Sequence, residues 1–335
     1  MDKSIKKVTI LGAGSWGTTL AIILSKNPGL SVNLWTAFPE QADNILSSRE
    51  NKDFLPSIKI PRKVKVTSCL NDALQSQIII VAVPVKFLRA LLQEIKKTDT
   101  DYKDRIFLSV AKGIETWSLK TPSQIMKEEL KLKKIAVLSG PTIAKEVVKS
   151  IPTVATIASL HKKSLSKLQR LFKGTPLRIY RSFDVTGTEL AGALKNIIAL
   201  ACGISDGLGF GTNTKAALLT RGLVEIARLG KRLGARSSTF WGISGMGDLA
   251  TTCFSPYSRN RFVGQEIGKG RKLKNIINEM KMVAEGITTV KSGFTLSKKL
   301  KIDMPITRQV YLVLYQNKKP LMAVKDLMSR PLKAE

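Results

Sequence analysis

Histidine is nearly absent from this chain of 335 residues, whose only one, His161, lies in the polar stretch SLHKKSLSK. Enzymes that move protons through a histidine–carboxylate pair are therefore poorly supported. Cysteine is also scarce: Cys69, Cys202 and Cys253 are too widely spaced for a disulfide framework or a metal pattern. We expect ordinary buried or half-buried cysteines in preference to a catalytic thiol, and no metal site.

Long apolar runs are missing as well, since none approaches the roughly 20 residues that a membrane-spanning helix needs. The first strand candidate, KKVTILGAG, begins almost at the first residue and leaves no room for a secretory signal. We therefore expect a cytoplasmic protein. Apolar residues make up 43% of the chain, which is enough for a real core, and the length suggests two domains.

Acidic residues are few, because 25 Asp and Glu face 55 Lys and Arg and leave a formal charge of +30. This balance favours anionic partners: phosphorylated small molecules, nucleic acid or an anionic membrane surface. The bases are scattered through stretches such as HKKSLSKLQR, GKGRKLK and LSKKLK, and only 6% of residues are aromatic. We interpret them as solvated helix faces and expect no specific nucleic-acid partner.

Strand and helix patterns alternate in the first half of the chain, which is typical of a doubly wound, mostly parallel sheet. The expected strands are 5–11, 31–37, 76–84, 104–115, 133–141, 152–159 and 176–182. After about Asp184 the strand signal stops, and helical spacing predominates. The expected helices are 186–204, 213–234, 258–270, 287–301 and 306–316.

Three glycines, Gly12, Gly14 and Gly17, have the spacing G-x-G-x-x-G directly after the first strand and at the start of an apolar helix. In this context Gly12 permits a tight turn, Gly14 lets the backbone approach a pyrophosphate, and Gly17 lets helix and strand pack closely. We therefore predict a Rossmann-type dinucleotide-binding α/β domain over 1–184 and an all-α substrate and catalytic domain over 185–335.

The end of the second strand usually selects between the two nicotinamide cofactors. An acid there holds the ribose 2′-hydroxyl, and an arginine accepts a 2′-phosphate. This chain has Trp35, Thr36, Ala37 and Phe38 and so has neither device, while Glu40 comes slightly late. The pattern leaves the choice between NAD(H) and NADP(H) open.

Several polar or turn-forming residues follow the later strands, at the sheet edge where ligands bind in open α/β folds. Lys112 lies in SVAKGIE, and Gly140, Thr142 and Ala144 lie in LSGPTIAKEV. A Gly-Pro-Thr turn offers N–H and hydroxyl donors to an oxyanion, although each loop taken singly can be ordinary. Pro84 in VAVPVKFL either ends its strand or forms a wall beside the cofactor.

One lysine stands out in the apolar helix ELAGALKNIIAL, where Lys195 precedes Asn196. No residue one turn away is a carboxylate, so this lysine either snorkels to water or is kept for a purpose. A lysine desolvated beside another cation, such as Lys112, can donate a proton to a ketone oxygen as hydride arrives. Asp248 in GMGDLATTC is a candidate to orient it.

A phosphate site is suggested by Arg259 and Asn260, which follow a Ser-Pro-Tyr-Ser turn at the start of a predicted helix. Amides at a helix N-terminus and a forked guanidinium together bind phosphate well. A solvated surface arginine is an equally good interpretation of Arg259 from these residues alone.

Together these segments resemble the bacterial NAD(P)-dependent glycerol-3-phosphate dehydrogenases over essentially the whole chain. The motifs that carry the resemblance, in order, are GAGSWGTTLA, VAVP, AKGIE, LSGPTIAKEV, ELAGALKNIIALACGISDGLGFGTNTKAALLTRG, GMGDLATTC, SRNRF, VAEGITT, MPIT and SRPLKAE. The resemblance implies reduction of dihydroxyacetone phosphate to sn-glycerol 3-phosphate with NAD(H) and/or NADP(H), supplying glycerophospholipid synthesis. It also implies a homodimer.

The resemblance assigns roles residue by residue, with Lys195 as general acid and base beside Lys112 and Asp248. The implied substrate contacts are Lys112, Gly140, Thr142, Lys195, Asn196, Asp248, Ser258, Arg259 and Asn260. The implied cofactor contacts are Gly12, Gly14, Ser15, Trp16, Gly17, Lys112, Ala144, Arg259, Val283 and Glu285. Thr142 replaces the usual serine and keeps its hydroxyl.

Two departures from the family pattern carry expectations. Thr36-Ala37-Phe38 lacks the Arg or His that suits a 2′-phosphate in most relatives, so we expect dual cofactor use or a shift toward NADH. The charge of +30 has no catalytic explanation, and it suggests either the general composition of the host proteome or loose contact with an anionic membrane surface.

Two other interpretations remain. A sister enzyme with a similar sheet, a helical second domain and a helical Lys-Asn pair acts on 3-hydroxy acids, and the Arg259-Asn260 phosphate site is what distinguishes it. A basic nucleotide-binding protein without chemistry is the other, and it would tolerate loss of Lys195.

Overall fold

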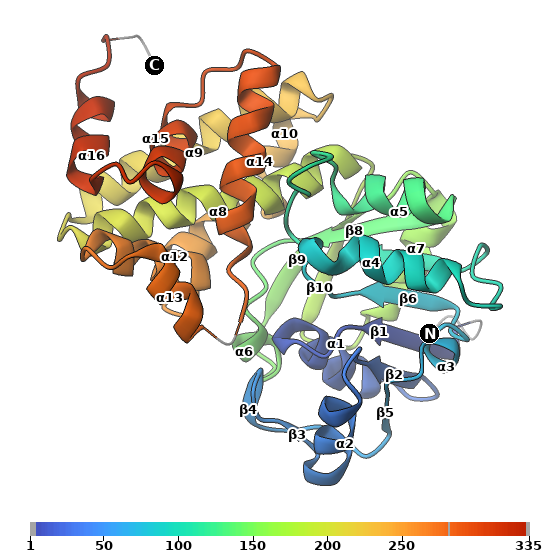
Figure 1. Cartoon of the computed structure of the whole chain (residues 1–335). Helices are drawn as coiled ribbons and strands as arrows, with labels where there is room; N and C mark the ends of the chain where they lie inside the picture. The colour runs from blue at the N-terminus through green and yellow to red at the C-terminus, as the bar shows by residue number, and fades with distance from the viewer. Residues whose placement is uncertain (1–4, 281, 333–335) are drawn as a thin grey trace. The chain divides into compact units, whose positions relative to one another are not determined.

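The computed structural model describes residues 5–280 and 282–332. The chain divides into two compact units (Figure 1). Unit 1 comprises Met1–Lys112 and Thr121–Glu189, and unit 2 comprises Gly113–Lys120 and Leu190–Glu335. The predicted fold class, a mostly parallel α/β part followed by an all-α part, is confirmed.

Unit 1 is built on one large sheet with the strand order β10-β9-β8-β7-β6-β1-β2-β5. Its strands are β1 (Lys7–Leu11), β2 (Ser31–Trp35), β5 (Val64–Thr67), β6 (Ile78–Val81), β7 (Ile106–Ser109), β8 (Ile135–Ser139), β9 (Thr153–Ala158) and β10 (Leu177–Ser182). Every neighbouring pair is parallel except β8 and β9. The strand order reverses between β1 and β6, so the carboxyl ends of these two neighbouring strands lie at the topological switch point.

Helices cover both faces of this sheet, as a doubly wound fold requires. They are α1 (Ser15–Ser25), α2 (Pro39–Ser48), α3 (Leu70–Ala73), α4 (Val85–Lys96), α5 (Pro122–Leu130), α6 (Ala144–Val147) and α7 (Lys162–Leu171). Side chains alternate between two cores: Ile78 and Ile80 of β6 join the core that contains α1, α2 and α7, while Ile79 and Val81 join the core that contains α3, α4 and α5. A strand buried on both faces has no polar side, which explains the continuous apolar run there.

Three features of unit 1 were not predicted. The strand β5 was missed because VKVT is short and interrupted by an exposed lysine. A small antiparallel pair, β3 (Glu50–Asn51) and β4 (Leu55–Lys59), was missed because its exposed side chains show little periodicity. β9 runs antiparallel to β8, and the connection between them contains only the four-residue helix α6.

Unit 2 is helical among its described residues. Its helices are α8 (Val185–Gly207), α9 (Thr212–Arg232), α10 (Ser237–Trp241), the π-helix η1 (Ile243–Gly247), α11 (Asp248–Phe254), α12 (Arg259–Gly268), α13 (Leu273–Glu279), α14 (Glu285–Lys299), α15 (Pro305–Tyr315) and α16 (Pro320–Met328). The short α10, α11, α13 and α16 were not predicted, since helices of five to nine residues show too few turns for a clear period. The segment 113–120 belongs to this unit, and Ile114 lies in its core.

The helix α8 runs from the end of unit 1 into unit 2. By length and composition it could cross a membrane, with a mean hydropathy of 1.2 in its most apolar window, yet that whole window is buried inside the fold. It is therefore the core helix of unit 2, and its burial explains why nearly every face is apolar.

Glycines let α8 and α12 approach each other closely. A Cβ atom added at Gly203 would lie 2.0 Å from the carbonyl oxygen of Arg261, and one added at Gly264 would lie 2.2 Å from that of Leu200. Gly207 and Gly268 meet the opposite helix in the same way, so each helix contributes a pair of glycines four residues apart. This close contact fixes the position of α12, and with it the N-terminal end of that helix, along the axis of α8.

Candidate functional site

The glycine-rich turn at the end of β1 is built as the dinucleotide motif requires. Gly12 has φ +115° and donates its N–H to the carbonyl oxygen of Trp35 at 2.9 Å, and a Cβ there would lie 2.9 Å from the carbonyl oxygen of Ala82. A Cβ at Gly17 would lie 1.9 Å from the carbonyl oxygen of Gly12. Gly14, by contrast, has open space where its side chain would be, which leaves its backbone approachable.

The first turn of α1 offers donors to an anion. The helix begins at Ser15, and within the described residues no side chain caps its N-terminus at Gly14. The Nε1 atom of Trp16 is buried and has no hydrogen-bond partner in the described part of the chain. A buried donor without a partner is uncommon, and a bound polar group would satisfy it. The open cradle at Gly14, the helix N-terminus and this donor all fit a dinucleotide.

Lys112 is held at the start of the loop after β7. Its Nζ donates to the carbonyl oxygen of Gly140 at 2.9 Å and to Oγ1 of Thr142 at 3.4 Å. The Thr142 hydroxyl in turn donates to the same carbonyl oxygen at 3.1 Å. The structure thus brings three predicted residues together. Ala144 begins α6, and its carbonyl oxygen accepts a 3.4 Å hydrogen bond from Thr19 on α1.

In unit 2, Lys195 is buried, with 6% of its surface exposed, and Asp248 is buried at 1%. The Lys195 ammonium donates to Oδ1 of Asp248 and to Oγ1 of Thr252. Thr252 lies one turn after Asp248 on α11, and its hydroxyl donates to the Asp248 carbonyl oxygen at 2.7 Å. The structure therefore excludes a lysine that snorkels to water, because the ammonium is paired inside the protein.

A short π-helix places Asp248 at the first position of α11. This segment, η1, runs from Ile243 to Gly247 and is tightly packed, since a Cβ at Gly245 would lie 2.0 Å from the carbonyl oxygen of Phe240. Single-turn π-helices occur frequently at functional sites. Here the π-helix directly precedes Asp248, whose carboxylate accepts the hydrogen bond from Lys195.

Asn196 and Asn260 are connected directly. The Nδ2 of Asn260 donates to Oδ1 of Asn196 at 2.9 Å, and Oδ1 of Asn260 accepts the backbone N–H of Gly286 at 2.9 Å. Both asparagines are buried. The amide of Asn260 therefore joins three helices, α8, α12 and α14.

Arg259 and its neighbours make a second connection to the start of α14. Nη1 of Arg259 donates to the carbonyl oxygen of Val283 at 2.8 Å. Desolvation by the surrounding protein lowers the pKa of Arg259, although part of the side chain keeps solvent-accessible surface, and the charge of Glu285 raises it. Ser258 is the N-cap of α12 and accepts the Arg261 N–H at 3.2 Å.

Two features of this site were missed from the sequence. Thr252 was not singled out, although its i, i+4 spacing from Asp248 places both on one face of a helix. Cys202 and Cys253 are buried and hydrogen-bonded to each other, and this bond together with burial raises the pKa of Cys253 well above its ordinary value. A thiol with a raised pKa is a poor nucleophile, which favours the ordinary interpretation of these cysteines.

A dinucleotide cradle on a doubly wound sheet and a buried lysine–aspartate pair in a helical unit define a nicotinamide-dependent oxidoreductase. The model of the NAD-dependent glycerol-3-phosphate dehydrogenase N-terminus matches residues 7–165, and that of its C-terminus matches residues 184–325. The chain therefore belongs to the NAD-dependent glycerol-3-phosphate dehydrogenase family, and the resemblance inferred from its motifs is confirmed.

Individual relatives agree with this placement. The chain is 46% identical over 332 residues to a protein of Syntrophotalea carbinolica named as the NAD(P)+ type of glycerol-3-phosphate dehydrogenase, with 98% of this chain and 99% of the relative covered. A relative of the same name from Thermoanaerobacter is 47% identical over 330 residues, with 98% of each chain covered. The crystal structure of glycerol-3-phosphate dehydrogenase from Coxiella burnetii is 34% identical, with a TM-score of 0.92 over 97% of this chain and 99% of that one.

Proposed function

We propose that this chain reduces dihydroxyacetone phosphate to sn-glycerol 3-phosphate with NAD(P)H and so supplies glycerophospholipid synthesis. The observation that carries the proposal is the buried Lys195–Asp248 pair, on a helix braced by Asn260 against the N-terminus of α12. Both domain models of the family match the chain, and the named relatives support the same reaction.

We assign dinucleotide binding to residues 1–184 and substrate binding with proton transfer to residues 185–335. When bound, the reduced nicotinamide supplies the hydride. The residues proposed to hold the dinucleotide are Gly12, Gly14, Ser15, Trp16, Gly17, Lys112, Ala144, Arg259, Val283 and Glu285. Among these, the α1 N-terminus favours the negative charge of the diphosphate through its N–H groups and its dipole.

Lys195 is the proposed proton donor. As hydride reaches the carbonyl carbon, negative charge develops on the carbonyl oxygen, and the ammonium stabilises that charge and transfers its proton there. The product is the secondary alcohol, and Lys195 recovers its proton from solvent. Asp248 and Thr252 hold the Nζ atom, so the ammonium keeps one position without reorganising during the reaction.

The phosphate of the substrate is assigned to the N-terminus of α12. Arg259 offers a forked guanidinium that always carries its charge, and the helix end adds backbone dipoles. Ser258 and Asn260 shape this end by capping and bracing it. Lys112, Gly140, Thr142 and Asn196 complete the proposed substrate contacts.

The test is direct. Purified protein is mixed with dihydroxyacetone phosphate and NADH or NADPH, the loss of reduced-nicotinamide absorbance is followed, and the product is identified by mass. Formation of glycerol 3-phosphate supports the proposal. Turnover of 3-hydroxy acids in place of this substrate would assign the chain to the sister reaction instead. Dinucleotide binding without turnover of either substrate would leave a non-catalytic binding protein.

We also propose a cytoplasmic homodimer. The three cysteines form no disulfide, and Cys202 and Cys253 are hydrogen-bonded to each other as thiols. Neighbouring thiols that stay reduced are typical of a reducing compartment such as the cytoplasm. The mass of the purified protein by light scattering tests the dimer, with a value near 36.8 kDa counting against it. Cell fractionation tests the compartment.

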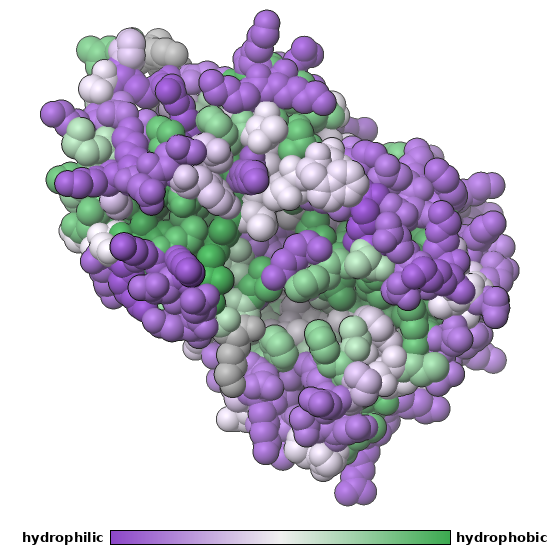
Figure 2. Space-filling view, in the orientation of Figure 1, coloured by the Kyte–Doolittle hydropathy of each residue, from purple (hydrophilic) through white to green (hydrophobic). Residues whose placement is uncertain are grey.

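Loose contact with anionic membrane is the last part of this proposal. Helix α16 exposes Leu321, Met322 and Met328, and Lys325 stands on the same side of the helix one turn after Leu321. Hydrophobic and hydrophilic side chains lie next to each other along the edge where α16 runs (Figure 2). Apolar groups flanked by bases suit a negatively charged lipid surface. Co-sedimentation with phosphatidylglycerol vesicles that fails with phosphatidylcholine vesicles is the expected result.

A further inference from the structure

The junction between β2 and α2 is fastened to the glycine-rich turn by side chains without charge. The hydroxyl of Thr36 donates to Oε1 of Gln41, and Nε2 of Gln41 donates to the carbonyl oxygen of Ala13 at 3.1 Å. Asn51 donates to the same carbonyl oxygen at 2.7 Å. Thr36 also accepts the N–H of Phe38 at 3.3 Å, and the Phe38 ring is 68% exposed.

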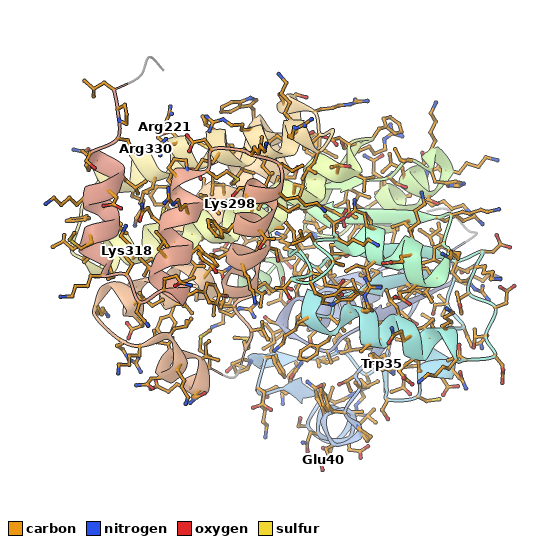
Figure 3. All side chains as sticks on the ribbon, turned by 45° about the horizontal axis from the view of Figure 1, so that its top comes forward. Trp35, Glu40, Arg221, Lys298, Lys318 and Arg330 are labelled. Atoms are coloured by element: carbon orange, nitrogen blue, oxygen red, sulfur yellow. The ribbon has the colours of Figure 1, made fainter. Side chains whose placement is uncertain are left out.

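This junction is acidic within a strongly basic protein. Residues 36–48 include Glu40 and Asp43 and contain no lysine, arginine or histidine, whereas the whole chain has a charge of +30. Glu40 is exposed in the first turn of α2. Figure 3 labels both ends of the junction, with Trp35 at the end of β2 and Glu40 on α2.

The basic residue that is nearest to the junction along the chain is Arg49, and its hydrogen bonds point away from the junction. Arg49 follows α2, and its guanidinium donates to the carbonyl oxygens of Arg62, at 2.5 Å, and Val64, at 3.4 Å. These contacts hold Arg49 toward the start of β5. Residues 36–48 at the end of β2 thus offer a ligand hydrogen-bonding groups and negative charge and contain no basic residue, while the guanidinium of the adjacent Arg49 is hydrogen-bonded to the carbonyl oxygens of Arg62 and Val64.

We propose that the β2–α2 junction selects NAD(H), which has a ribose 2′-hydroxyl, over its 2′-phosphorylated counterpart NADP(H). In this class of fold the adenosine ribose lies at the carboxyl end of the second strand. A 2′-hydroxyl can donate to an acceptor there, whereas a 2′-phosphate would bring a charge near −2 toward Glu40, and residues 36–48 contain no basic side chain to pair with it. The inference rests on the proposed function for the identity of the ligand class.

Binding tests this without turnover. NADH and NADPH are titrated into the protein, and each Kd is measured from energy transfer between tryptophan and the reduced nicotinamide. We expect NADH to bind about tenfold more tightly than NADPH, a difference of about 1.4 kcal/mol, because the 2′-phosphate meets negative charge at the junction. Ala37→Arg, at an exposed position of the junction, should remove most of this preference by tightening NADPH. Ser47→Arg adds the same charge in the last turn of α2 and should leave the preference unchanged.

Equal or tighter binding of NADPH by the natural chain would overturn the inference. So would an equal gain in NADPH affinity from Ala37→Arg and Ser47→Arg, because it would show a general effect of charge. Neither result touches the proposed reaction, which is measured separately by product formation. A protein that prefers NADH but makes no glycerol 3-phosphate would instead retain this inference and refute the proposed function.

Discussion

The side chain of Asn260 donates to that of Asn196 over 2.9 Å, so the residue after Lys195 is tied to the first turn of α12. The other end of the same amide accepts the N–H of Gly286. Two of its hydrogen-bonding positions are thus used inside the protein. We regard Asn260 as a brace that sets where Arg259 stands relative to Lys195.

Asn260→Leu removes this brace, so that Asn196 and Gly286 each lose the hydrogen bond that Asn260 makes with them. We expect a loss of about 1–3 kcal/mol in the free energy of unfolding, as is usual when buried polar groups lose a partner. KM for dihydroxyacetone phosphate should rise while NADH affinity stays near its original value. Asn275→Leu, at an exposed position of α13, is the matched control. An unchanged KM would show that the brace does not position the phosphate site.

Lys195→Met tests the proton donor. We expect kcat to fall by about 10²–10⁴, the usual contribution of a positioned acid, with the Kd for NADH unchanged. The variant also leaves the buried Asp248 carboxylate without its ammonium, which is destabilising, so Lys195→Met combined with Asp248→Asn should recover stability but no activity. Lys231→Met on the exposed side of α9 is the control. Turnover retained in the double variant would rule out Lys195 as the acid.

Gly264→Ala tests the close approach of α8 and α12. The added methyl would lie 2.2 Å from the carbonyl oxygen of Leu200, so the helices must separate. We expect a loss of about 1–3 kcal/mol by thermal unfolding, together with a rise in KM for the phosphorylated substrate. Gly211→Ala has open space around it and costs only the preference for glycine at the N-cap of α9, so it should lower Tm less than Gly264→Ala does. Equal Tm values for the two variants would contradict the packing argument.

Glu225 predicts a pH dependence of stability. Its buried carboxylate accepts the N–H groups of Ile306 at 2.6 Å and Thr307 at 3.2 Å, and desolvation raises its pKa to about 7. Because the folded state binds this proton more tightly than the unfolded state, stability from this group falls as pH rises from about 4.5 to 7. The expected loss is roughly 3 kcal/mol.

The measurement compares unfolding of the natural chain and of Glu225→Gln across that pH window. The glutamine does not ionise, so the stability of the variant relative to the natural chain should improve steadily from pH 4.5 to 7. A constant difference would mean that Glu225 ionises normally in the folded protein.

Much of the fold could be predicted from local patterns. The all-apolar run at β6 predicts a strand that is buried on both faces. The glycine spacing before α1 predicts a turn in which backbone segments approach each other closely. β9 could not be oriented in this way, because the direction of a strand depends on its connection and neighbours. The hairpin of β3 and β4 was invisible for a related reason, since exposed strands lack a hydrophobic period.

The candidate site likewise contains residues that could be predicted from the sequence and contacts that could not. Lys195 could be singled out because a charge in an apolar helix conflicts with its surroundings. Its partners Asp248 and Thr252 lie more than 50 residues away along the chain, so their contact with Lys195 exists only in the folded protein. Gln41 carried no signal at all, because its hydrogen bond to Ala13 exists only once α2 has packed beside the glycine-rich turn.

The segment 113–120 gives the chain an interlaced path. The polypeptide leaves unit 1 after Lys112, contributes Ile114 to the helical core, returns at Thr121 and leaves again after Glu189. Ser292 on α14 donates to the Ile114 carbonyl oxygen at 2.9 Å, so a hydrogen bond as well as core packing attaches this segment to the helices. A gene fragment that encodes only 185–335 therefore lacks part of its own interior. The two units therefore cannot be exchanged between relatives by a single crossover. A recombinant must take the segment 113–120 from the same relative as the helices that it packs against.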